Sequence, residues 1–210
     1  FMGKEKSIVF IGDSITDAGK TQDPDGYGNG YVRLIRDYLV INRPNNYPLI
    51  INKGIGGHRI IDLADRWESD VIALQPDYVS VSIGINDVWR QLDHPEMEQV
   101  YPNRFKQVYQ DILSQVKERV DAKIILMEPT VIDENPESIG NQKLSAYVEI
   151  VRELTESFDA ILVPTHRQFI DYLNKDNPVK LTTDGVHMNS TGNLLMAQTW
   201  LEAVWEYLES

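Results

Sequence analysis

The sequence contains no cysteine, and this absence excludes several kinds of chemistry at once. Thiol catalysis, cysteine-ligated zinc and disulfide frameworks all require a residue type that the chain does not have. A chain of 210 residues can bury most of its apolar surface, so folding requires neither a disulfide nor a metal ion. The length suits one domain, which we expect over residues 2–210, leaving out Phe1, which precedes Met2.

Positive charge is also scarce. Lys and Arg together number 20, against 32 Asp and Glu, which gives a formal net charge of −12. Binding to nucleic-acid phosphates or to anionic membranes depends on clustered Lys and Arg. We therefore expect neither a nucleic-acid partner nor a membrane partner.

Long hydrophobic runs are missing as well. No stretch reaches the roughly 18 apolar residues that a transmembrane helix requires. Near the N-terminus, the apolar run of residues 8–11 is too short for a signal-peptide core, and Gly12 and Asp13 follow it directly. We therefore expect a cytoplasmic protein.

Short apolar runs alternate with amphipathic segments along the whole chain. The runs have the length of strands buried on both faces of a sheet, whereas the longer segments repeat their apolar residues with the helical period. We expect strands at residues 8–11, 48–51, 78–83, 123–127 and 160–163, helices at 31–41, 60–74, 104–120, 138–158 and 191–208, and a Gly-rich loop at 19–30. This alternation predicts a parallel β-sheet with helices on both faces.

Three of the expected strands end in turns that are rich in glycine or polar residues. Residues 12–14 follow the first strand, residues 54–57 the second, and residues 84–90 the third. In a parallel sheet the carboxyl ends of the strands lie at one edge, where ligands bind. We expect these turns to converge there, although Ser14 or Asp13 alone would also suit a helix cap.

A histidine and an aspartate lie close together near the C-terminus. Asp184 and His187 are three residues apart, with Gly185 between them. We expect a helical turn, which would put both side chains on the same side. An aspartate that orients a histidine beside a hydroxyl nucleophile makes a Ser–His–Asp triad, so the pair is meaningful if it reaches Ser14. The chain has no Gly-x-Ser-x-Gly motif, which argues against a conventional α/β-hydrolase.

Four separated segments resemble the sequence blocks of the SGNH hydrolases, also called GDSL-like lipases and esterases. Residues 12–15 (Gly-Asp-Ser-Ile) are similar to the serine block and residues 52–57 (Asn-Lys-Gly-Ile-Gly-Gly) to the glycine block. Residues 84–87 (Gly-Ile-Asn-Asp) are similar to the asparagine block and residues 184–187 (Asp-Gly-Val-His) to the aspartate–histidine block. The resemblance covers nearly the whole chain. It implies a three-layer α/β/α, flavodoxin-like fold with a five-stranded parallel sheet.

The resemblance also implies the roles of individual residues. Ser14 would be the nucleophile, His187 the general base and Asp184 the residue that orients it. The oxyanion hole would consist of the backbone N–H groups of Ser14 and Gly57 and the side-chain amide of Asn86. Neither a metal ion nor an organic cofactor is required for this chemistry.

Two residues differ from the family pattern, and two further segments are similar to one group of enzymes within the family. Ile15 stands where the namesake motif has Leu, and Gly56 stands where Ser is usual. Residues 65–68 (Asp-Arg-Trp-Glu) and 85–90 (Ile-Asn-Asp-Val-Trp-Arg) are similar to segments of intracellular acetylxylan esterases, which remove acetyl groups from xylo-oligosaccharides. The resemblance therefore implies a serine esterase for acetyl esters, with an acetylated sugar as its small-molecule substrate. Whether the chain forms a homo-oligomer is left open.

Other residues near these blocks are candidates for substrate binding. Trp89 and Arg90 follow the asparagine block directly, so we expect them to line the substrate pocket, with core packing as the alternative for the tryptophan. Tyr27, in the Gly-rich loop after Ser14, is a candidate for the pocket rim.

Two other functions remain open from the sequence. A lysophospholipase or thioesterase would use the same triad with a longer apolar groove. A non-catalytic flavodoxin-like binding module would instead hold a phosphate at the first turn. The binding module leaves Asp184 and His187 without a role.

Overall fold

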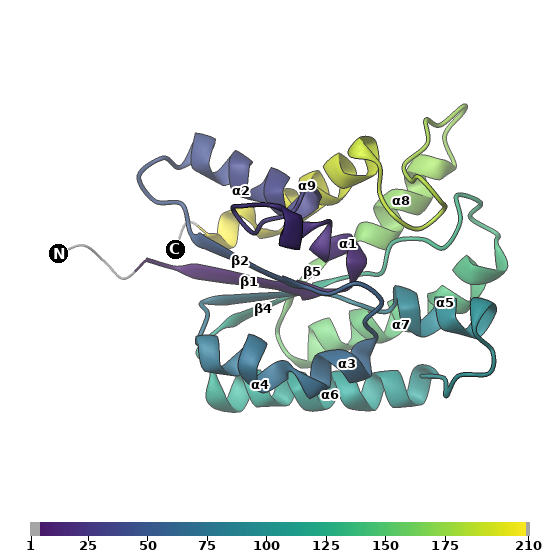
Figure 1. Cartoon of the computed structure of the whole chain (residues 1–210), viewed down its shortest axis with the longest axis horizontal. Coiled ribbons are helices and arrows are strands. Elements are labelled where there is room, and N and C mark those ends of the chain that lie inside the picture. The colour runs from purple at the N-terminus through teal and green to yellow at the C-terminus, as the bar shows by residue number, and fades with distance from the viewer. Residues whose placement is uncertain (1–4, 209–210) are drawn as a thin grey trace.

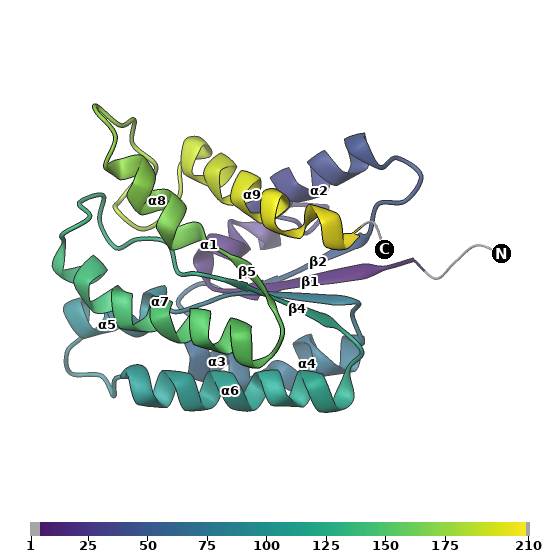
Figure 2. The same cartoon turned by 180° about the vertical axis from the view of Figure 1, so that it is seen from behind.

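A five-stranded parallel sheet lies between two layers of helices in the computed structural model, which describes residues 5–208 (Figures 1 and 2). The strands are β1 (Ser7–Gly12), β2 (Leu49–Gly54), β3 (Tyr78–Ser82), β4 (Lys123–Met127) and β5 (Ile161–Val163). They are arranged in the order β2-β1-β3-β4-β5, and each neighbouring pair is parallel. This is the flavodoxin-like order, so the predicted fold is confirmed.

The helices divide between the two faces of the sheet. One face is covered by α1 (Ser14–Asp17), α2 (Tyr31–Asn42), α8 (Thr165–Leu173) and α9 (Ser190–Val204) (Figure 1). The other is covered by α3 (Ile60–Asp65), α4 (Trp67–Asp70), α5 (Ile85–Asp93), α6 (Pro102–Arg119) and α7 (Ile139–Ser157) (Figure 2). Within the described part of the chain, no helix combines the length and the hydropathy that a membrane crossing requires. The predicted domain, residues 2–210, extends past the described residues at both ends, and its limits stay a prediction.

The centre of the sheet is fully enclosed by these layers. Residues 8–11 of β1 have no solvent exposure, as a strand between two helical layers requires. Trp200 of α9 packs on Phe10 with ring centroids 5.3 Å apart, and its indole N–H donates to Ser80 Oγ at 3.0 Å. Trp200 is therefore a core residue.

The first three strands end level with one another. Gly12, at the end of β1, pairs with Gly54 at the end of β2 and with Ser82 at the end of β3. A Cβ atom on Gly12 would collide with Ser82 O and with Thr16, so this junction requires glycine. The register brings the turns after the three strands to one place on the sheet edge.

The helix predicted over residues 60–74 is wrong as a continuous element. The chain forms α3, α4 and a 3₁₀ turn, η2 (Ile72–Leu74), in its place. Arg66, between α3 and α4, has φ −115° and ψ 11°, outside the helical region. Ile60, Leu63, Trp67 and Val71 are buried on both sides of the break, so the hydrophobic pattern did not reveal it.

Two segments are helical where the sequence analysis expected none. Residues 84–90 were predicted as a turn, but α5 begins at Ile85, directly after Gly84, whose φ is +129°. Helix α8 follows Pro164 and buries Phe169 and Leu173, which are four residues apart. The final helix ends at Val204 and continues as a 3₁₀ turn, η3 (Trp205–Leu208).

Candidate active site

Ser14 is the first residue of α1, at the carboxyl end of β1. Asp13 is the helix cap, because its side chain accepts a hydrogen bond of 2.9 Å from Ile15 N. Asp13 is therefore the N-cap, and the Ser14 hydroxyl is not used for capping. Its Oγ lies 2.9 Å from His187 Nε2.

The structure brings Ser14, His187 and Asp184 into one hydrogen-bonded chain. His187 Nδ1 lies 2.6 Å from Asp184 Oδ2, on the side of the ring away from Ser14. An ionised carboxylate only accepts hydrogen bonds, so Nδ1 carries the proton and Nε2 is free to accept the serine proton. This is the arrangement of a catalytic triad.

The electrostatics of Asp184 favour its ionised form. Partial burial raises the pKa of this carboxyl, but hydrogen bonds from the His187 ring, from the backbone N–H of His187 and from Val186 N lower it more. The net result is a pKa below the usual range for aspartate. A charged Asp184 is suited to stabilise a protonated imidazole.

The segment that carries Asp184 and His187 is a loop, so the predicted helical turn is wrong. The loop is closed by a β-bridge between Thr182 and Met188, and Asp133 N donates to Gly185 O at 2.8 Å. Gly185 has φ +93°, a conformation that glycine adopts without strain. The side chains of Asp184 and His187 meet because the backbone N–H groups of Val186 and His187 bind the Asp184 carboxylate. Helical spacing does not bring them together.

The Glu134 carboxylate binds the first residues of this loop. The sequence analysis did not identify Glu134 as a residue that supports the site. One carboxylate oxygen accepts from Leu181 N at 2.7 Å and the other from Thr182 Oγ1 at 2.6 Å. Thr182 Oγ1 in turn accepts from Gly185 N at 2.9 Å. No motif marks Glu134, because its partners are 47 and 48 positions away in the sequence.

The expected oxyanion donors belong to turns that follow the level ends of β1, β2 and β3. A Cβ atom on Gly56 would come within 3.7 Å of Ser14 Cβ, so the glycine block packs against the nucleophile. Gly57 has φ +80° and open space where a side chain would begin. Asn86, in the first turn of α5, is 3% exposed and donates from Nδ2 to His58 O at 3.1 Å. An amide nitrogen has two protons, so one N–H of Asn86 is left for another acceptor.

Two buried carboxyl groups lie beneath these turns. Burial raises the pKa of Asp13 to about 6 and that of Asp87 to about 7, and the hydrogen bonds from Ile15 N and Ile60 N only partly offset this effect. Asp87 Oδ1 accepts from Ile60 N at 3.2 Å, so the carboxyl braces the start of α3. Its Oδ2 has no hydrogen-bond partner among the described residues.

The expected substrate-binding residues occupy two different places. The ring of Trp89 lies 5.7 Å from the His187 ring, so this residue borders the triad while it packs against the core. The Arg90 guanidinium lies 5.0 Å from the centre of the Trp89 ring and pairs with Asp93 at 3.1 Å. Tyr27 lies elsewhere, in the loop before α2, with its ring against that helix.

The ring of Tyr27 contacts two arginines of α2. The guanidinium groups of Arg33 and Arg36 lie 5.4 and 5.2 Å from the centre of its ring. Its backbone carbonyl accepts from Asn52 Nδ2 at 2.9 Å. These contacts hold the loop after α1 in place and do not involve the triad.

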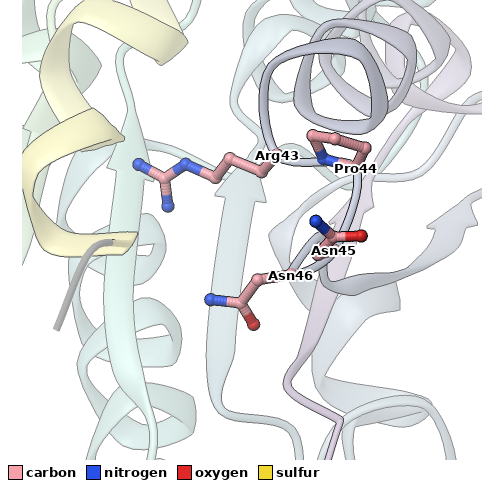
Figure 3. A pocket seen from close by; sticks show the side chains of 4 residues that line it. All are labelled: Arg43, Pro44, Asn45 and Asn46. Carbon is pink, nitrogen blue, oxygen red and sulfur yellow. The ribbon is translucent and has the colours of Figure 1, made fainter.

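The structure also has a hollow of about 300 Å³ at the amino-terminal edge of the sheet (Figure 3). Its lining residues are Arg43, Pro44, Asn45 and Asn46, in the segment that leads into β2. The triad lies at the carboxyl edge, beyond the other end of this strand, so the hollow is separate from it. No cluster of three or more His, Asp or Glu side chains within residues 5–208 is arranged to hold a metal ion.

Comparison with known proteins places this geometry in a family. The model of the GDSL-like lipase/acylhydrolase family matches residues 10–195. The chain belongs to this family. The resemblance seen in the sequence is therefore confirmed, and the protein is a serine-type ester hydrolase.

The chain is similar to known proteins, in sequence and in structure, along nearly its whole length. The chain is 35% identical over 218 residues to an acetylxylan esterase of Geobacillus stearothermophilus, covering 100% of this chain and 99% of that protein. The crystal structure of that enzyme, Axe2, has a TM-score of 0.89 at 34% identity and covers 97% of this chain and 95% of Axe2. LAE5, an α/β-hydrolase enzyme from the metagenome of Lake Arreo in Spain, has a TM-score of 0.88 at 34% identity and covers 95% of both chains. Crystal structures described as catalytic mutants of Axe2 replace an aspartate, a serine and a histidine by alanine.

Proposed function

We propose that the protein removes acetyl groups from acetylated xylo-oligosaccharides by a Ser–His–Asp mechanism. The observation that carries the proposal is the hydrogen-bonded chain from Ser14 through His187 to Asp184, with Gly56 of the glycine block beside the nucleophile. The sugar substrate is supported by the full-length similarity to an acetylxylan esterase.

The first half of the reaction transfers the acetyl group to the enzyme. Ser14 Oγ attacks the ester carbonyl carbon while its proton passes to His187 Nε2, which forms a tetrahedral intermediate. His187 then returns this proton to the sugar oxygen as the carbon–oxygen bond breaks, and the deacetylated sugar leaves. The product of this half is an acetyl ester on Ser14.

The second half uses water in place of the sugar. A water molecule attacks the acetyl carbonyl carbon and gives a proton to His187 Nε2. The second tetrahedral intermediate collapses, the proton returns to Ser14 Oγ, and acetic acid is released, to ionise in solution. Asp184 stays ionised throughout and stabilises the imidazolium in both halves.

The negative charge on the tetrahedral intermediates requires donors that are already in place. We assign the backbone N–H groups of Ser14 and Gly57 and the second side-chain N–H of Asn86 to this role. The removal of one such donor typically costs about 3–4 kcal/mol in the transition state. The positive φ of Gly57 and the hydrogen bond from Asn86 to His58 O support the assignment, since both fix the direction of the donor.

Trp89 is the residue best placed to contact the sugar. Its ring borders the ring of His187, which protonates the leaving sugar oxygen. A tryptophan face next to this atom suits the apolar face of a pyranose. A cytoplasmic location and a role for Arg90 at the pocket remain predictions of the same proposal.

The test is acetate release from a panel of acetylated xylo-oligosaccharides, measured beside p-nitrophenyl esters of increasing acyl length. We expect acetate release from the sugars and a rate that falls as the acyl chain lengthens. A preference for long acyl chains would favour the lysophospholipase or thioesterase alternative. Ser14→Ala should lose at least about 10³-fold in kcat. Full activity in this variant would remove Ser14 from the mechanism and return the binding module to consideration.

A further inference from the structure

Arg66 lies at the break between α3 and α4, and its side chain is only 12% exposed. Its guanidinium makes four hydrogen bonds: Nη2 to Gly12 O at 3.0 Å, Nη1 to Lys53 O at 2.6 Å, Nη1 to Asp70 Oδ2 at 2.9 Å, and Nε to His58 Nδ1 at 3.1 Å. A guanidinium group has five N–H donors in a planar fork, so most of its donors are used here.

Three of these four acceptors belong to the turns that surround the nucleophile. Gly12 O is two residues before Ser14, at the end of β1. Lys53 O and the His58 ring lie on either side of residues 54–57, the glycine block. One charged group therefore ties together the turn that carries Ser14 N–H and the turn that carries Gly57 N–H.

The contact with His58 extends this link to Asn86. A guanidinium only donates, so His58 Nδ1 has no proton and the ring is the neutral Nε2–H form. Burial and, secondly, the charge of Arg66 lower the pKa of His58, which agrees with a neutral ring. The backbone carbonyl of the same residue accepts one N–H of Asn86 and so directs the other N–H of this amide.

If Arg66 only stabilised the connection between α3 and α4, its contacts would be confined to those two helices. The ion pair with Asp70, four residues along the chain, is of that kind. It uses one of the four hydrogen bonds. The other three reach across the sheet edge to residues 8 to 54 positions away.

We propose that Arg66 is a positioning residue of the oxyanion hole: its guanidinium fixes the turns of Ser14 and Gly57 directly and sets the amide of Asn86 through His58. The proposal rests on the proposed function, because it concerns donors whose use is the stabilisation of an oxyanion. Arg66 itself does not contact the reacting atoms.

The first test is Arg66→Lys, which keeps the charge but loses the planar fork. Misplacement of catalytic groups by about 1 Å costs on the order of 10²-fold in rate, so we expect kcat to fall about 30- to 100-fold. KM for p-nitrophenyl acetate should change less than about 3-fold, because the ground-state ester makes little use of the oxyanion donors. Unchanged kcat in a folded Arg66→Lys variant would overturn the proposal.

Arg152→Lys is the matched control. Arg152 likewise pairs with a carboxylate, with Nε 2.6 Å from Oε2 of the buried Glu128, but it lies on α7, outside the turns of the active site. This variant should lose stability and keep kcat. A kcat loss equal to that of Arg66→Lys would mean that any lost arginine fork produces the effect, and would also overturn the proposal.

Substitutions of His58 test the route to Asn86 with little risk to folding, because this side chain is only partly buried. His58→Ala removes the Nδ1 acceptor but keeps the backbone carbonyl, and we expect kcat to fall about 5- to 10-fold. His58→Asn places an amide oxygen near the Nδ1 position and should restore kcat to within about 3-fold. Equal kcat values for His58→Ala, His58→Asn and the wild type would exclude the link through His58.

A double-substitution cycle measures the coupling itself. If Arg66 acts partly through Asn86, the kcat loss from Arg66→Lys should be at least about 5-fold smaller in an Asn86→Ala background. Independent, multiplying losses would contradict the coupling.

The tautomer of His58 gives a readout that does not depend on activity. In ¹⁵N NMR spectra at neutral pH, we expect His58 with an unprotonated Nδ1 and a protonated Nε2, and a shift of the Nδ1 signal in Arg66→Lys. A protonated Nδ1 in the wild type would overturn the proposal even in a fully active enzyme. If Ser14→Ala instead keeps its activity while the His58 signals appear as expected, the esterase mechanism fails and the contact between Arg66 and His58 stands.

Discussion

Replacing Asp87 with asparagine should stabilise the protein at alkaline pH. The carboxyl has no solvent exposure, and one of its oxygens has no hydrogen-bond partner within residues 5–208. Burial raises its pKa from 3.8 to about 7, with the hydrogen bond from Ile60 N opposing and the nearby charge of Asp13 adding to the rise. Asparagine has nearly the same shape, can accept the same hydrogen bond, and never ionises.

The size of the effect follows from the difference in proton binding between the folded and the unfolded chain. Between pH 3.8 and about pH 7 the folded protein holds a proton on Asp87 that the unfolded chain has lost. Stability from this group is therefore fully present below pH 4 and falls as the pH rises through 7. At 1.36 kcal/mol per pKa unit, the wild type loses about 3 kcal/mol between pH 5 and pH 8, and Asp87→Asn does not.

The assay is thermal unfolding of both proteins across pH 5 to 8. For a chain of this length, about 3 kcal/mol corresponds to a difference in Tm on the order of 10 °C. Asp65→Asn, at an exposed carboxyl, should give the same pH dependence as the wild type. If the Tm curves of Asp87→Asn and the wild type run parallel, Asp87 does not titrate in this range and the argument from burial is refuted.

Two further predictions concern the groups around the nucleophile. Asn86→Ala should lower kcat about 10²- to 10³-fold with little change in KM, since it removes one oxyanion donor; steady-state kinetics on p-nitrophenyl acetate measure this, and a loss confined to KM would contradict the role. Glu134→Gln should reduce the free energy of unfolding by about 1–2 kcal/mol, because the amide keeps only one of two acceptors for the loop of Asp184 and His187. Chemical denaturation measures this change, and equal stability would mean that Leu181 N and Thr182 find other partners.

The sheet, and the meeting of three strand ends at the nucleophile, were predictable because they depend on local features of the sequence. A short apolar run that ends in glycine, such as residues 8–12, can form a buried strand and little else. Once all strands run parallel, their carboxyl ends share an edge, so Ser14, residues 54–57 and Asn86 come together without further information. The cap next to Ser14 was undecided between two residues, and the structure assigns it to Asp13.

The remaining features depend on contacts between distant parts of the chain. The helix over residues 60–74 breaks at Arg66, whose side chain binds carbonyl groups of β1 and β2, and such contacts leave the hydrophobic period unchanged. The loop of Asp184 and His187 is held by Glu134, which no local pattern could indicate. Helix α5 had a helical signal in Ile85 and Val88, three residues apart, but Gly84 and the polar residues after it favoured a turn.

The hydrogen bond between Ser14 and His187 joins residues 173 positions apart in the sequence. Closing so long a loop costs conformational entropy that a few local contacts cannot offset, so this contact forms only when most of the sheet and its helices are in place. On the ribosome the nucleophile emerges early, whereas its base follows only after all five strands have been made. A nascent or partly folded chain therefore carries a serine without a base, and hydrolysis begins only once the fold is complete.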